Sequence, residues 1–264
     1  MSLRENANKI MSAALCAAMP DTAVRAALEK ADFSEGRLVL VAAGKAGWQM
    51  ASAAWEQLGS RISGGVVVTK YGHNKGPIGN LDIYEAGHPV PDENSFRGTQ
   101  AAIDAVQGLT EKDTVLFLLS GGGSALFEKP LIPAADLDRL TRELLACGAD
   151  IVEMNTVRKR FSAVKGGRFA QLCQPAQVFT IVLSDVLGDP VDVIASGPAA
   201  ADSATTAEAK RIARKYGLDE NPEVARLLEV ETPKSVPNVR TQIIGSVRQL
   251  CAAAEKVAKE LGYE

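Results

Sequence analysis

Short apolar runs alternate along this chain with longer segments in which apolar positions recur every three or four residues. The short runs, mostly rich in Val, Leu and Ile, predict six buried strands: 37–42, 65–69, 81–85, 114–119, 177–183 and 239–244. The longer segments predict helices near 5–18, 21–31, 46–58, 95–107, 135–147, 151–164, 205–216 and 246–261. Because strands alternate with helices of this length, we expect a Rossmann-like α/β protein with a doubly wound, mostly parallel sheet and helices on both faces.

The best candidate for a linker is residues 230–238, which place two prolines among residues of mixed polarity. We therefore expect a Rossmann-like domain over residues 1–236 and a final strand and helix over residues 237–264. The last helix reaches Gly262, a residue type that favours helix C-termini, and two residues follow. A helix of this fold class normally leads into another strand, so we expect 237–264 to lead toward a further domain that this chain lacks. A natural C-terminal helix is the alternative.

Composition narrows the class of function. The 264 residues are 46% hydrophobic, enough for a sizeable core, and the net charge of −3 with only 5% aromatic residues argues against nucleic acid or anionic membrane as partners. No apolar run approaches the ~18 residues of a membrane span. The four cysteines are far apart, which indicates free thiols and a cytoplasmic protein. With two histidines, a His-rich metal site is excluded.

The most informative motif directly follows the apolar run 114–119. Glycines at the carboxyl end of a buried parallel strand let the backbone approach a ligand closely, with N–H groups free to surround an anion. Open α/β sheets bind ligands at this edge. We expect a phosphate or carboxylate there, with a tight turn that binds nothing as the alternative. The motif consists of Ser120, Gly121, Gly122, Gly123 and Ser124.

The turn after the first strand carries Gly44, Lys45 and Gly47. A dinucleotide fingerprint needs a third glycine and an acidic residue after the second strand, where this chain has Lys70. A Walker A loop is absent too, because Lys45 is not followed by Ser or Thr. What remains is a lysine at a helix N-terminus, which opposes the helix dipole and therefore requires an anionic partner. A plain surface lysine is the alternative.

Two further loops follow predicted strands. Asp185 and Asp189 lie four residues apart after the strand 177–183, a pattern that suits Mg²⁺ held by carboxylates and phosphates, or a base for a hydroxyl proton. Asp in such a loop also favours turns. His88 lies in a loop stiffened by two prolines and could line a site, but a structural role with helix capping by Asp92 or Asn94 is equally open.

In the predicted helix 151–164, polar residues recur at steps of three and four. Such residues share one stripe, which here adjoins an apolar one and would suit an anion. Lys159 and Arg160 are expected to point away from it. A solvated basic face is the alternative. The stripe comprises Asn155, Arg158, Ser162 and Lys165.

The chain carries seven motifs in a fixed order: 44–47, 87–92, 120–126, 155–159, 162–167, 183–189 and 194–198. Together they resemble the class II glycerate 2-kinase family, some members of which are named hydroxypyruvate reductase. The resemblance spans residues 5–264. It implies transfer of the γ-phosphoryl group of ATP, with Mg²⁺, to D-glycerate, giving 2-phosphoglycerate in a cleft between two domains, the second of which is absent here. Arg160 with Phe161, and Pro190, depart from the family pattern beside the motifs.

The resemblance also implies roles for individual residues. Lys45 would neutralise charge on the transferred group, and Ser120 to Ser124 would hold phosphates or the glycerate carboxylate. Asp185 and Asp189 would position Mg²⁺ or the substrate hydroxyl, while Arg158 and Lys165 would add positive charge. Gly44 and His88 are expected at the same site, and a homodimer is an open expectation.

Two other functions stay open. An NAD(P)-dependent hydroxypyruvate reductase is one, although the incomplete glycine fingerprint and Lys70 argue against it. The other is an inactive single-domain fragment that binds an anion without turnover, because half of an interdomain cleft would be missing.

Overall fold

The computed structural model describes residues 2–33 and 35–263. Its centre is a six-stranded sheet in which every pair of neighbouring strands is parallel and the order is β3-β2-β1-β4-β5-β6. This is the strand order of the Rossmann fold, so the predicted fold class is confirmed. The strands are β1 Leu38–Ala43, β2 Ile62–Lys70, β3 Leu81–Ala86, β4 Thr114–Ser120, β5 Gln177–Leu183 and β6 Val239–Gly245.

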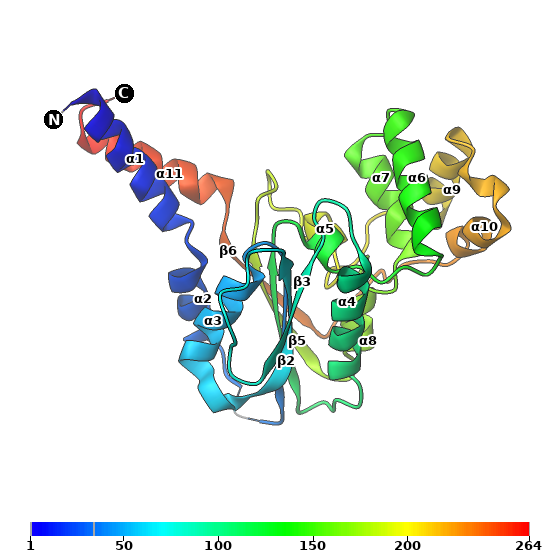
Figure 1. Ribbon diagram of the computed structural model, residues 1–264, viewed down its shortest axis with the longest axis horizontal. Helices are drawn as coiled ribbons and strands as arrows, with labels where there is room; N and C mark the ends of the chain where they lie inside the picture. The colour runs from blue at the N-terminus through cyan, green and yellow to red at the C-terminus, as the bar shows by residue number, and fades with distance from the viewer. Residues whose placement is uncertain (1, 34, 264) are drawn as a thin grey trace.

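Helices cover both faces of the sheet (Figure 1). Alternate residues of the buried strand β1 belong to opposite hydrophobic cores, as the two-residue period of a strand requires. Helices α2 (Pro20–Leu28) and α3 (Gly47–Leu58) pack on one face. Helices α4 (Glu93–Ala105) and α8 (Arg168–Leu172) pack on the other.

Four helices form a separate cluster beside the sheet, here called the helical lobe (Figure 1). They share their own hydrophobic core, which includes Leu140, Val157, Ile212 and Leu228. The lobe therefore holds together through its own apolar contacts as well as through its links to the sheet. Its helices are α6 Ala134–Ala146, α7 Ile151–Arg158, α9 Thr206–Lys215 and α10 Pro222–Leu228.

On the opposite side, α1 (Leu3–Ala17) and α11 (Val247–Glu260) pack against each other and project from the body as a helix pair (Figure 1). No helix within the described residues is long and apolar enough to cross a membrane. The short helices are α5 Gly123–Leu126 and the 3-10 turns η1 Gly59–Arg61, η2 Lys159–Phe161, η3 Ile194–Ser196 and η4 Leu218–Glu220. Of the helices, α5, α8 and α10 were not predicted from the sequence.

The last strand belongs to the main sheet, because β6 pairs with β5 from Val178 to Leu183. The proposed boundary at residue 236 therefore falls just before a strand of this sheet. The division into residues 1–236 and 237–264 stays a prediction, and its outermost residues, 1 and 264, lie outside the described ones.

The predicted helix 151–164 is wrong at its C-terminal end. Helix α7 ends at Arg158, η2 follows, and Ser162 is extended and bridges to Pro130. Ser162 and Lys165 therefore do not continue a helical stripe from Asn155. The expectation that Lys159 and Arg160 point away from the core is also wrong, since they are only 3% and 0% exposed.

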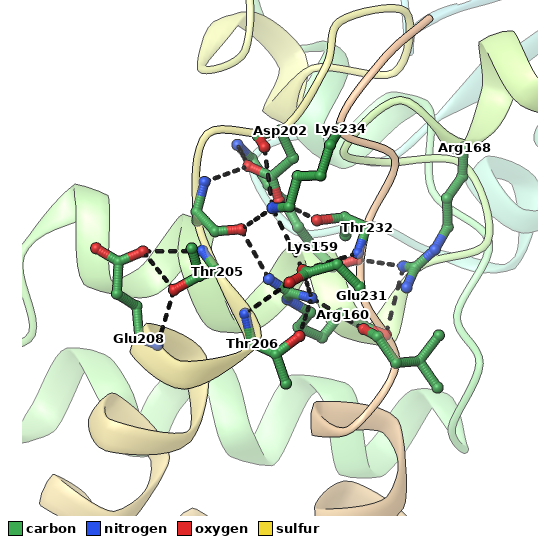
Figure 2. A network of polar contacts seen from close by, with 12 residues as sticks. Lys159, Arg160, Arg168, Asp202, Thr205, Thr206, Glu208, Glu231, Thr232 and Lys234 are labelled. Carbon is green, nitrogen blue, oxygen red and sulfur yellow. Dashed lines mark hydrogen bonds and ion pairs between the residues drawn. The ribbon is translucent and has the colours of Figure 1, made fainter.

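A buried polar network explains why these two cations lie inside (Figure 2). The Lys159 ammonium donates to Asp202 Oδ1 at 2.9 Å, and the Thr232 hydroxyl donates to Asp202 Oδ2 at 2.8 Å. Arg160 donates to the Glu231 carboxylate at 2.6 Å. Burial by itself would raise the pKa of Asp202, but Lys159 and Thr232 hold that pKa below its usual range.

The candidate linker, residues 230–238, runs from the end of α10 to β6 and is held by hydrogen bonds to other parts of the protein. Glu231 and Thr232 are held by the contacts just described, and Asn238 donates to the carbonyls of Ala170 and Ala176, each at 3.0 Å. The two prolines thus lie in a segment that connects the helical lobe to β6 and is fixed in place by these hydrogen bonds.

Replacing Asp202 by Asn should destabilise the protein by about 3–5 kcal/mol, because the Lys159 ammonium would stay buried without a counter-charge. Urea unfolding at pH 7 measures the change. Asp138→Asn is the matched control: Asp138 pairs with Arg142 on the surface, and its loss should cost less than about 1 kcal/mol. Equal losses in the two variants would contradict a structural role for the buried pair.

Candidate functional site

The order of strands reverses between β1 and β4, which places a crevice at their carboxyl ends. The two turns that leave these strands touch directly. Lys45 N–H donates to the Gly121 carbonyl at 2.9 Å, and Ala46 N–H donates to Ser120 Oγ at 3.0 Å. A Cβ on Gly44 would lie 2.2 Å from Ser120 Oγ, and Gly44 has φ +126°. Only glycine satisfies both the close contact and this backbone conformation.

Residues 120–124, here the glycine loop, form the second turn. Gly122 has φ +87° and is the N-cap of α5. Its carbonyl accepts hydrogen bonds from the N–H groups of Ala125 and Leu126 in that helix. Among the described residues, the N–H groups of Gly122, Gly123 and Ser124 have no acceptor. These unpaired donors are what an anionic ligand would use.

Asp185 lies directly beside the glycine loop. A Cβ on Gly121 would lie 2.1 Å from Asp185 Oδ2, so a larger residue would displace the carboxylate. Lys45 Nζ lies 3.9 Å from Asp185 Oδ2, and the two side chains are 43% and 59% exposed. An ion pair this long and this exposed contributes little to stability, so both charges stay available to a ligand.

His88 completes this part of the site from the loop after β3. A Cβ on Gly122 would lie 2.9 Å from His88 Cδ2 and 3.1 Å from Lys45 Cγ, so both side chains pack over that glycine. Partial burial lowers the pKa of His88, and the charges of Lys45 and Lys70 lower it further, whereas Asp185 raises it. His88 is therefore neutral at pH 7.

The loop that carries His88 also has the structural role considered for it, the capping of the next helix. Asp92 is the N-cap of α4, and its Oδ1 accepts from Ser95 N–H at 3.0 Å. Capping by Asp92 fixes the loop, and the fixed loop holds His88 against the glycine loop. The two interpretations of this segment are compatible.

A cavity of about 270 Å³ lies beside Lys45 and Asp185. Sequence reasoning missed several of its walls, which come from the helix pair and from the end of β6. Ser246, the N-cap of α11, could have been found because it follows a strand, as Asp185 does. The missed residues are Ala18, Ser246, Val247 and Leu250.

Asp189 lies in the same loop as Asp185, with φ +53°. Its Oδ1 is buried and has no hydrogen-bond partner. It does not line the cavity beside Lys45. Among the described residues, no group of three or more His, Cys, Asp or Glu side chains could hold a metal ion by itself.

The two remaining predicted cations lie away from the crevice. Lys165 is fully buried: its ammonium donates to the carbonyls of Ser124 at 2.7 Å and Phe127 at 3.1 Å and lies 3.3 Å from Glu128. Burial lowers the pKa of Lys165, whereas the charge of Glu128 raises it. Arg158 lines a different cavity of about 310 Å³, between the loop after β3 and α6.

Strand order and site together define a Rossmann-like α/β protein whose switch point suits an anionic ligand. The chain belongs to the family described as domain of unknown function (DUF4147), whose model matches residues 6–229. The names of its relatives confirm the resemblance to class II glycerate 2-kinases that the motifs indicated.

The D-glycerate 2-kinase of Thermotoga maritima is 52% identical over 264 residues, covering 99% of this chain and 63% of that protein. A protein of Agrobacterium vitis named putative hydroxypyruvate reductase is 43% identical, covering 96% of this chain and 57% of that protein. The crystal structure of glycerate kinase from Thermotoga maritima matches with a TM-score of 0.93 at 51% identity, covering 99% of this chain and 63% of that one. The chain thus spans less than two thirds of the length of these relatives.

Replacing Gly44 by Ala should disrupt the contact between the two turns. Gly76→Ala is a close control, because Gly76 has φ +127° but nothing within 4 Å of its Cβ position. Both variants carry similar backbone strain, and only Gly44→Ala adds the clash with Ser120. We expect Gly44→Ala to cost about 1–3 kcal/mol more than the control in urea unfolding. Equal costs would mean that the turns tolerate separation.

The pKa of His88 should lie below that of an ordinary histidine and should rise when Lys45 is replaced by Met. The reason is that the positive charge of Lys45 disfavours the imidazolium form. NMR titration of the imidazole protons measures both values. Lys75→Met, which removes an exposed cation near Trp48, should leave the His88 pKa unchanged. A wild-type pKa at or above the ordinary value would refute the packing described for His88.

Proposed function

We propose that this chain forms the nucleotide- and substrate-handling part of an ATP- and Mg²⁺-dependent D-glycerate kinase that yields 2-phosphoglycerate. The observation that carries the proposal is the meeting of Lys45, Asp185 and the glycine loop at the switch point of the sheet. Relatives named glycerate kinase support the choice of reaction.

Phosphoryl transfer depends on positioning the reactants and on stabilising charge. The unpaired N–H groups of Gly122, Gly123 and Ser124 would bind phosphate or carboxylate oxygens. Lys45 would neutralise charge on the transferred group, with little competition from the long contact to Asp185. His88, packed over Gly122, would hydrogen-bond the ligand.

The carboxylates fit Mg²⁺ in the manner typical of kinases. Mg²⁺ is usually held by one or two carboxylates together with substrate phosphates. Asp185 is exposed beside the glycine loop, and Asp189 has a buried oxygen without a partner. Asp185 and Asp189 would hold the ion, which would neutralise phosphate charge when bound. Asp185 would alternatively accept the substrate hydroxyl proton.

The site would lie in a cleft completed by a second domain. The turns that carry it emerge between the helical lobe and the helix pair (Figure 1). The relatives are longer than this chain, which leaves room for such a domain in the intact enzyme. A cytoplasmic location and a homodimer stay predictions.

The test is an assay for ADP release with ATP, Mg²⁺ and D-glycerate, on protein whose intact mass has been measured. Formation of 2-phosphoglycerate, followed by ³¹P NMR, supports the proposal. Oxidation of NAD(P)H by hydroxypyruvate without ADP release would replace it with the reductase. Tight anion binding with no turnover would favour a binding domain.

Lys45→Met should lower kcat at least about 100-fold, because a preorganised charge at the reacting phosphate would be lost. The control is Lys75→Met, since Lys75 is an exposed lysine outside the candidate site. We expect this control to retain wild-type kcat and KM. Near-normal turnover in Lys45→Met would remove the role assigned to Lys45.

A further inference from the structure

Two consecutive hydrogen bonds connect the helical lobe to the glycine loop. Ser124 Oγ lies 3.1 Å from Ser196 Oγ, and the Ser196 hydroxyl donates to Asn155 Oδ1 at 3.3 Å. Ser196 and Asn155 are 1% and 8% exposed. Asn155 belongs to α7 of the helical lobe, and Ser124 belongs to the glycine loop. These three side chains therefore form a polar link between two parts of the fold.

Ser196, which takes part in both hydrogen bonds, has an unfavourable backbone conformation. Ala195, Ser196 and Gly197 have φ values of +51°, +62° and +64°, in the left-handed region that non-glycine residues rarely adopt. Hydrogen bonds from Gly166 N–H to Ser196 O at 3.0 Å and from Gly167 N–H to Gly197 O at 2.7 Å hold the turn. Strain of this kind persists where surrounding structure enforces it, often next to functional sites.

This strained turn also packs directly against the glycine loop. A Cβ on Gly123 would lie 2.6 Å from Ala195 Cβ, a distance that real Cβ atoms do not show. The loop is thus fixed on the side of the turn by both a steric contact and a hydrogen bond. Neither contact involves the charged residues to which the proposed function gives a role.

The direction of the hydrogen bonds follows from counting protons. A hydroxyl has one proton, and Ser196 gives its proton to Asn155 Oδ1. The bond between the two serines must therefore use the proton of Ser124. In this arrangement the Ser124 hydroxyl can only accept a further hydrogen bond, which suits a ligand hydroxyl better than a phosphate oxygen.

We propose that Ser196 and Asn155 are positioning residues that orient the Ser124 hydroxyl and order the glycine loop for ligand binding. The inference rests on the proposed function, in which this loop binds the anionic ligand. It extends that function to two residues that do not touch the cavity beside Lys45. It also predicts that the helical lobe influences the site through α7.

The experiment compares Ser196→Ala, Ser124→Ala and the double variant with wild-type protein. Amide hydrogen exchange is measured without ligand at Ala125, Leu126 and Phe127, whose N–H groups donate to carbonyls of the glycine loop, and urea unfolding gives the global stability. We expect Ser196→Ala to speed exchange in the loop by about fivefold, the worth of one hydrogen bond. The double variant should match Ser124→Ala alone, because the serines act through one bond. Asn155→Ala breaks the same chain at its other end and serves if Ser196→Ala folds poorly.

Ser203→Ala is the control, since it removes an exposed hydroxyl bonded to Asp192 in the same segment. It should leave exchange in the loop unchanged. Unchanged exchange in Ser196→Ala, or effects that add to those of Ser124→Ala, would overturn the positioning role. Exchange that rises equally throughout the protein would also overturn it, because that indicates general destabilisation.

A titration with D-glycerate, followed by NMR, separates this inference from the proposed function. If wild-type protein binds D-glycerate, Ser196→Ala should weaken binding about fivefold, and unchanged affinity would count against the inference. If wild-type protein binds neither D-glycerate nor Mg-ATP, the proposed function fails. The exchange data then still decide whether Ser196 orders the loop.

Discussion

The contact between the turns that follow β1 and β4 is the constraint on which the site depends. Gly44 can lie against Ser120 only because it has no side chain. This contact brings Lys45, at the start of one crossover, next to the glycine loop, at the start of another. Parallel strands align their carboxyl ends at one edge, so the loops after β3 and β5 add His88 and Asp185 at the same place.

Charged side chains fall into a buried set that supports the fold and an exposed set at the candidate site. Lys159, Arg160 and Lys165 are buried, and each donates hydrogen bonds to carboxylate or carbonyl oxygens of the protein. Lys45 and Asp185 are exposed and only 3.9 Å apart, a weak contact that a ligand can replace. Basic residues that look alike in the sequence thus differ in role: some stabilise the fold from inside, and Lys45 stays exposed.

The sequence predicted the sheet because its strands are short apolar runs that carry a strong local signal. The resemblance to the kinase family, rather than any local pattern, implied that the glycine loop, Lys45, His88 and Asp185 share one site. The sequence missed α5, α8 and α10, which are too short for a periodic pattern. It extended α7 to residue 164, because polar steps of three and four continue beyond Arg158.

The sequence by itself therefore determined the fold class, the family and the loops that form the site, because these depend on local periodicity and on motifs. Only the tertiary structure decided which polar residues are buried. Lys165 supports the glycine loop from beneath, and Ser196 links that loop to Asn155. Such roles depend on contacts between residues 41 or more positions apart in the chain, and local sequence patterns carry no information about contacts of that range.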